Sequence, residues 1–362
     1  MKTFVRLFGI VLIGLIVCNP VESSAKTNSL ILLDHQSGID YTDSAIELVT
    51  YYAGEVYHVF RLKVLMGYVP PENVAHLIGR AGILSICQNQ TEPDKTDPVV
   101  NSAIKAFNNL LQPVKELTEE EMQKRSLEGI KDKVRITYPT KGSKTGLSDR
   151  FTSEYMIGRV AVGIVIVEGN GPPQLNWTQQ ELDSVTTQIT WGLDWLANKA
   201  SESNSNVCWF YDWHYSVPVP EEPIMGPSGS DLSDQDAVIS WIGYAIQALG
   251  YNPGSHVWSP FVGWWVFTDG VSAIYSYVHN IRRTNKTDWA FAMFVANGDT
   301  FTDGLYAWAM GWNDRHFLGL PIGRDHGGPY LVMTRDNKVF GLDDMWHVVA
   351  HESFHIFGPV DE

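Results

Sequence analysis

The strongest constraint on the fold is the run GRVAVGIVIVEG at residues 158–169, which is apolar almost throughout and rich in β-branched side chains. Such a run predicts a strand that is buried on both faces of a sheet. The next segment predicts a helix, because Thr178 and Glu181 have the spacing of a capping box. Its apolar residues recur at helical spacing on one face: Leu182, Val185, Ile189, Leu193 and Leu196.

The sequence after this strand and helix continues to alternate between the two patterns. We expect a strand at NVCWFYDWHYSV, a helix over residues 233–249 that Gly250 ends, and a last helix that starts near Asp343 and Asp344. Three further strands are expected around DWAFAMFVANG, GLYAWAMGW and GGPYLVMT. The order β-α-β-α-β-β-β-α predicts one mixed sheet packed on helices, in the α/β (α+β) class.

Four segments of the chain differ in composition. Residues 1–25 have the pattern of a signal peptide, with basic residues, an apolar run too short for a comfortable bilayer span and a small residue at position 25. An uncleaved membrane anchor is the alternative for this segment. Residues 26–136 predict a small α/β region with a helix near Asp43, acting as a propeptide or accessory domain. Residues 137–150 are rich in Gly, Ser, Thr and Lys and predict a linker, and 151–362 form the main domain.

The net charge, the N-terminal segment and the cysteines indicate which partners and which cellular compartment to expect. A net charge of -15 argues against a nucleic-acid partner, which requires a basic face. We expect an exported protein, extracellular or at the cell surface, with no stable membrane insertion after signal cleavage. Cys87 and Cys208 are expected to be two separate thiols, and three glycosylation sequons are expected at the surface, at Asn89, Asn176 and Asn285.

The last helix carries the clearest chemistry, in the sequence WHVVAHESFHIFGPVDE. Its expected core stripe comprises Trp346, Val349, Ala350, Ser353, Phe354 and Phe357. His351 and His355 are four residues apart on a neighbouring face, a spacing that lets both bind one zinc ion. Glu352 is then placed to act as the general base, which takes a proton from a zinc-bound water.

The motif continues beyond the second histidine. Gly358 and Asp361 complete the pattern His-Glu-x-x-His-x-x-Gly-x-x-Asp, in which a turn at Gly358 brings a third ligand to the zinc. Asp361 is the expected third ligand, with Glu362 or a later residue as alternatives. This pattern resembles the metzincin zinc metalloproteases, in particular snapalysin-like and immune-inhibitor-like secreted metallopeptidases.

The resemblance implies a secreted zinc-dependent endopeptidase that acts on protein or peptide substrates. It also implies that GGPYLVMT forms the edge strand above the cleft, where a peptide adds as a further strand. Metzincins continue into a subdomain with a methionine turn, so the resemblance implies that the catalytic domain is cut short here.

Alternative interpretations of these features remain open. The other enzyme class is a gluzincin, whose third ligand is a glutamate on a later helix. A non-catalytic cell-surface or glycan-binding protein would use the aromatic strands instead, although strand positions favour aromatic residues in the core anyway. We expect His347 to be a surface or supporting residue, His326 to be a solvated loop residue, and Cys87 to be a structural thiol and not a stopper on the zinc.

Overall fold

The structure is a computed structural model that describes most of the chain between Asn28 and Phe357. The described residues are 28–92, 97–112, 156–171, 176–202, 205–220, 223, 235–259, 264–297, 307–310, 329–335 and 342–357. The predicted signal peptide and linker lie outside these residues. So do His326, Gly358, Asp361 and Glu362, and the predictions that concern them remain predictions.

A single mixed sheet of nine strands runs through the described part of the chain. Its centre is β5 (Gly158–Gly169), which is parallel to β6 (Val207–Val219) on one side and to β9 (Trp289–Ala296) on the other. All residues from 160 to 167 are buried. The strand predicted from the β-branched run is therefore confirmed, together with its burial on both faces.

Beyond β9 the sheet ends in two short strands. β11 (Tyr330–Thr334) is parallel to β9, and β10 (Ala307–Met310) is antiparallel to β11. β10 is the outermost strand on this side among the described residues. The expectation that GGPYLVMT forms the edge strand is thus wrong, because the segment GLYAWAMGW pairs on its outer side.

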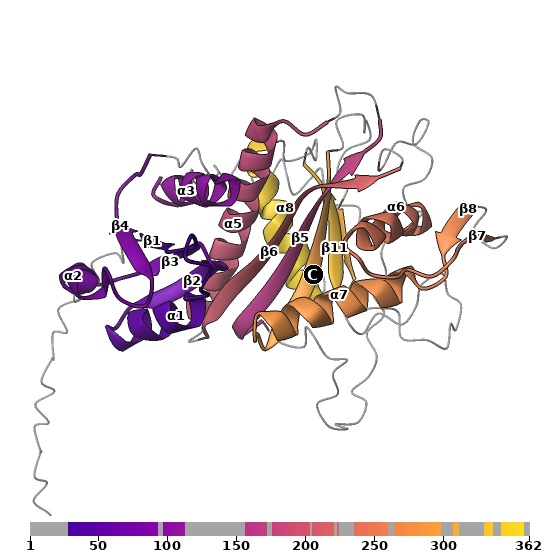
Figure 1. Cartoon of the computed structure of the whole chain (residues 1–362). Helices are drawn as coiled ribbons and strands as arrows, with labels where there is room; N and C mark the ends of the chain where they lie inside the picture. The colour runs from indigo at the N-terminus through magenta and orange to yellow at the C-terminus, as the bar shows by residue number, and fades with distance from the viewer. Residues whose placement is uncertain are drawn as a thin grey trace, which may run out of the picture.

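On the other side of β5 and β6 the sheet continues into the N-terminal region (Figure 1). The strands follow in the order β2 (Glu55–Phe60), β3 (Val64–Tyr68), β1 (Asn28–Leu33) and β4 (Ile83–Cys87). β2 is parallel to β6, and the other contacts in this region are antiparallel. The predicted α/β character of the region is confirmed, and its strands extend the sheet of the main domain.

Helices cover both faces of the sheet (Figure 1). One face carries α3 (Pro98–Leu110), α5 (Gln179–Glu202) and α8 (Met345–Ile356). The other carries α1 (Thr42–Tyr51), α6 (Gln235–Ala248) and α7 (Gly270–Thr284). Shorter elements complete the fold: η1 (Pro71–Asn73), α2 (Val74–Leu77), the hairpin of β7 (His256–Ser259) and β8 (Trp264–Phe267), and η3 (Leu342–Asp344).

The helix α5 forms as the sequence predicts and sits between α3 and α8. The Glu181 amide donates to the Thr178 hydroxyl at 3.3 Å, and the Thr178 amide donates to the Glu181 carboxylate at 2.7 Å. This reciprocal pair is the expected capping box. The five residues of its predicted apolar face are all buried. None of the described helices is both long and apolar enough to cross a bilayer.

Two smaller predictions have different outcomes. Cys87 and Cys208 are separate free thiols, as expected, and burial raises the pKa of Cys208 to about 12. Of the three sequon asparagines, Asn89 and Asn176 are exposed but Asn285 is only 7% exposed. Its side chain amide donates to the Ile281 carbonyl and accepts from Arg61, so the expectation of a surface position is wrong there.

Candidate metal centre

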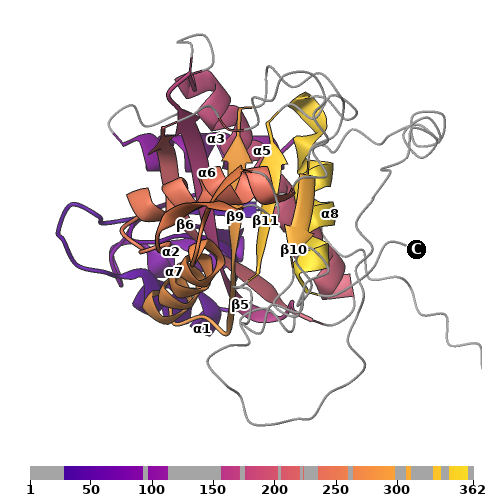
Figure 2. The same ribbon diagram turned by 90° about the vertical axis from the view of Figure 1, so that its right-hand side faces the viewer.

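The helix α8 is fixed against α5 by close contacts between the two backbones. A Cβ atom at Gly192 of α5 would lie 2.5 Å from the Trp346 carbonyl oxygen and 2.8 Å from the Val349 Cβ. Only glycine leaves room for this approach. The Trp346 ring also stacks on Trp191, with the ring centroids 5.4 Å apart. Figure 2 shows that the other side of α8 lies next to β10.

The first turn of α8 is held by a side chain from α5. Asp344 precedes the helix without making a side-chain cap, but Gln188 supplies the missing contacts. Its Oε1 accepts from the Trp346 amide at 3.0 Å, and its Nε2 donates to the Asp343 carbonyl at 3.0 Å. Gln188 therefore serves as a remote cap, since a helix N-terminus otherwise leaves its first amides without partners.

The buried side of α8 differs from the predicted core stripe, most clearly at Phe354 and Glu352. Phe354 is 44% exposed, although the sequence placed it in the core. Glu352 is only 2% exposed, although the predicted stripe does not include it. The remaining buried residues of the helix are Met345, Trp346, Val348, Val349, Ala350, Ser353 and Ile356. The stripe is therefore rotated toward Glu352, because α8 rests on the end of the sheet as well as on α5.

The two motif histidines meet at the border of this buried side. The Nε2 atoms of His351 and His355 lie 3.0 Å apart, and the two rings are perpendicular with centroids 4.5 Å apart. Two nitrogens that each lie about 2.0–2.1 Å from one tetrahedral zinc ion are roughly 3.3 Å apart. The pair is thus arranged so that both nitrogens can reach one ion. The same distance also fits one N–H···N hydrogen bond between neutral rings.

A metal site needs more donors than these two. In the part of the chain that the structure describes, no group of three His, Cys, Asp or Glu side chains gathers around one point. The predicted third ligand, Asp361, lies outside that part. Two imidazoles with a carboxylate form a donor set that suits zinc. The two histidines fit such an ion, and the completion of the site stays a prediction.

Glu352 occupies an unusual place for a carboxylate. At about 100° per residue it is roughly 60° from His355 around the helix, on the sheet-facing side. A buried carboxylate is costly unless its surroundings compensate it.

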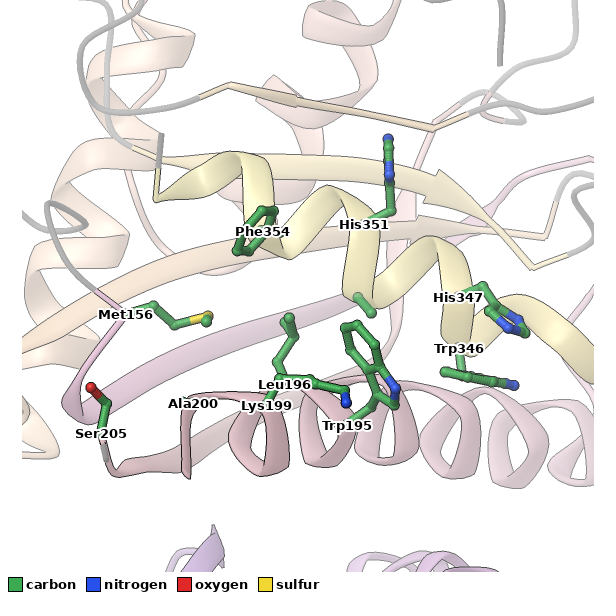
Figure 3. A pocket seen from close by; sticks show the side chains of 11 residues that line it. Met156, Trp195, Leu196, Lys199, Ala200, Ser205, Trp346, His347, His351 and Phe354 are labelled. Atoms are coloured by element: carbon green, nitrogen blue, oxygen red, sulfur yellow. The ribbon is translucent and has the colours of Figure 1, made fainter. Parts of the chain in front are cut away.

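A cavity of about 740 Å³ lies between α5 and α8 on the outer side of this helix pair. Its lining is mainly apolar, with Met156, Leu196, Ala200, Ala350 and Phe354, and it includes Trp195 and Trp346. In Figure 3 the side chain of His351 points away from α5, whereas Trp346 points toward it. The cavity therefore borders the histidine without lying in front of its ring.

The other candidate residues lie apart from the histidine pair. His347 stacks on the neighbouring Trp346 with ring centroids 3.5 Å apart, and its Nδ1 lies 3.8 Å from the Asp344 carboxylate. Cys87 ends β4, at the opposite edge of the sheet from β10, so the structure does not place this thiol near the histidines. In the aromatic strand β6, Trp209, Phe210 and Tyr211 are buried, which confirms their assignment to the core.

The sequence did not predict that Gln188 and Gly192 position α8. Both lie on α5, far from the motif in sequence, and neither residue type signals a contact with a later helix. Comparisons with family models, with curated proteins and with solved structures gave no match for this chain. The case for a function therefore rests on the residues themselves.

Proposed function

We propose that this protein is a secreted zinc-dependent endopeptidase of the metzincin type. His351 and His355 are its first two metal ligands, Asp361 is the third, and Glu352 is the catalytic base. The observation that carries the proposal is the convergence of the two imidazole nitrogens, 3.0 Å apart, beside a carboxylate that is 2% exposed.

The helix gives each of these residues a separate task. His351 and His355 hold the ion and keep its position relative to the backbone of α8. When bound, zinc acts as a Lewis acid that polarises a carbonyl group, and it lowers the pKa of water toward neutrality. Glu352 accepts the proton of the attacking water and passes it to the nitrogen of the departing amine. Its buried position shields this carboxylate from bulk water, which strengthens its interactions with nearby charge.

The substrate class follows from the strand next to α8. β10 is the last strand of the sheet among the described residues, and α8 packs directly against it. An edge strand offers a row of backbone donors and acceptors to an extended peptide. A peptide paired with β10 would run alongside the histidine helix. This arrangement supports a polypeptide as substrate.

The variant Glu352→Gln tests the assigned chemistry. The amide keeps the size of the side chain but cannot take a proton, so hydrolysis of denatured, fluorescently labelled casein should fall about 10²–10⁴-fold. The zinc content, measured by atomic absorption, should stay the same because Glu352 is not a ligand.

Ser353→Ala is the matched control on the same helix. Ser353 is fully buried, and its hydroxyl has no hydrogen-bond partner among the described residues. This variant should keep both the zinc and the activity of the parent. Full activity in Glu352→Gln would refute the mechanism, and loss of zinc in that variant would make Glu352 a ligand.

A further inference from the structure

The N-terminal region shares both of its hydrophobic cores with the rest of the protein. On one face, Ile31, Leu33 and Val59 belong to the same buried cluster as Val165 and Phe210. On the other face, Phe60, Val100, Ile104 and Phe107 are buried with Leu193, Trp209 and Tyr211. Among its described residues, the region between β1 and α3 has no separate core of its own, which an independently folding domain would need.

A polar cluster at the centre of this junction joins three elements. His58 of β2 is 1% exposed and lies opposite Trp209 in the parallel pairing of β2 with β6. Its Nε2 is 3.1 Å from the Asp194 carboxylate of α5, and its Nδ1 is 2.7 Å from the Tyr211 hydroxyl. The carboxylate can only accept, so Nε2 donates to Asp194, and the Tyr211 hydroxyl is the hydrogen-bond partner of Nδ1. Burial raises the pKa of Tyr211 well above its usual value, which keeps its hydroxyl protonated.

A second polar contact joins the two helices α3 and α5. Asp183 of α5 is 5% exposed and accepts from the Ser102 hydroxyl at 3.0 Å. It also forms an ion pair with Lys105 of α3. Gln179 of α5 also donates to Asp183 at 3.0 Å, but the cation that pairs with this carboxylate, Lys105, lies on α3. Separation of the N-terminal region would therefore break both the ion pair and the hydrogen bond from Ser102.

A third set of contacts fixes the opposite face. The Asp43 carboxylate of α1 pairs with Arg159 of β5 at 2.9 Å and with Lys286, just after α7, at 2.8 Å. Arg61, just after β2, donates to the Thr284 carbonyl and to the Asn285 side chain. The N-terminal region is thus tied to β5, β6, α5 and the end of α7.

We infer that residues 28–112 are a permanent half of the folded domain, which stays bound after the chain is cut between residues 112 and 156. A removable propeptide would instead leave a self-contained domain behind. Here its removal would unpair the outer edge of β6 and expose the buried faces of α5 and β6. This inference decides between the propeptide and the accessory region, and it does not depend on the proposed metal chemistry.

The helix α5 extends the consequence to the histidine helix. α5 contacts α3 through Asp183, and it holds α8 through Gln188 and Gly192. The N-terminal half therefore stabilises α5, and α5 in turn holds α8 in place. Loss of this half should disorder the histidine pair as well as the sheet.

The test is to cut the full chain and ask whether the pieces separate. A specific protease site replaces residues 140–147, and a denaturing gel verifies complete cleavage. Size exclusion with light scattering at low micromolar concentration and neutral pH should then give one species with the summed mass of both pieces. Two species, one of them a monomeric C-terminal piece that keeps its circular dichroism spectrum, would overturn the inference.

A variant of the central cluster makes the test quantitative. In the cleaved protein, His58→Ala should raise the dissociation constant of the two pieces by roughly 10–100-fold, because two buried hydrogen bonds are lost. His76→Ala is the matched control, since His76 is exposed on α2 of the same region. Equal dissociation constants for His58→Ala and His76→Ala would contradict the role of the junction. If His58→Ala does not fold before cleavage while His76→Ala does, the N-terminal half is required for folding and the inference stands.

Discussion

The remote cap on α8 allows a sharp prediction for the variant Gln188→Leu. Leucine fills nearly the same space but removes both hydrogen bonds, which are 3.0 Å each, from a side chain that is 8% exposed. The Trp346 amide then lacks its partner in a buried setting, at a cost of about 1–2 kcal/mol, and the Asp343 carbonyl loses a bond worth about 0.5–1 kcal/mol. The expected loss of folding free energy is about 2 kcal/mol, in the range of a lost helix cap.

Thermal unfolding and hydrogen exchange measure this effect independently. For a protein of this size, about 2 kcal/mol corresponds to a fall in Tm of roughly 3 °C. If α8 opens locally, the Trp346 amide should exchange about 30-fold faster than in the parent. Gln180→Leu, an exposed position on the same helix, serves as control and should change stability by less than about 0.5 kcal/mol. A Tm for Gln188→Leu equal to that of Gln180→Leu would show that Gln188 does not cap α8.

Two further predictions concern the fit of α5 against α8 and the response to acid. Gly192→Ala should lower the free energy of unfolding in urea by about 1–2 kcal/mol. The added methyl group would clash with the Trp346 carbonyl, and this cost outweighs the gain in helix propensity. A variant more stable than the parent would refute the close approach of the two helices. The hydrogen bond from Lys286, with those from Arg159, holds the pKa of Asp43 below its ordinary value of 3.8. Because the folded pKa is the lower one, the contribution of Asp43 is complete above about pH 5 and is lost as the pH falls through 4 and below. In the cut protein, the affinity between the two pieces should therefore fall between about pH 5 and pH 3 more steeply than in the variant Asp43→Asn, whose affinity is already lower at neutral pH. Identical pH profiles of dissociation for the two proteins would contradict this role of Asp43.

Local patterns predicted the elements that depend on local physics. The run at β5 is apolar on both faces, so its burial followed from the side chains alone. The capping box of α5 likewise depends on residues three apart, and it formed as expected. The pair of histidines at positions four apart on α8 belongs to the same class of feature, since the helix itself brings their rings together.

Features that depend on distant partners were harder to predict. β11 pairs with β9, and β10 lies outside it. Because both segments have similar apolar patterns, the sequence does not indicate which of the two pairs with β9. Phe354 is exposed because α5 and the sheet meet α8 elsewhere around its circumference. The helix α7 was missed, although Asp269 before it and the basic pair Arg282 and Arg283 near its end were available as signals.

The N-terminal region shows the same limit at a larger scale. Its α/β character and its helix near Asp43 were predicted, but no feature of the β2 sequence indicates a parallel contact with β6, which lies some 150 residues later. His58 is a good example, because a histidine in a strand gives no sign of its partners. Only the fold reveals that Tyr211 and Asp194 enclose it.

The central claim is that His351 and His355 share a metal ion and not merely a proton. Titration of the metal-free protein with zinc, against a chromogenic chelator, tests it directly. The account predicts about one tightly bound zinc per chain, its loss in His355→Ala, and its retention in His347→Ala, whose ring stacks on Trp346. No zinc uptake by the parent protein, or equal zinc affinity in His355→Ala, would contradict the claim and leave the two rings joined by a hydrogen bond alone.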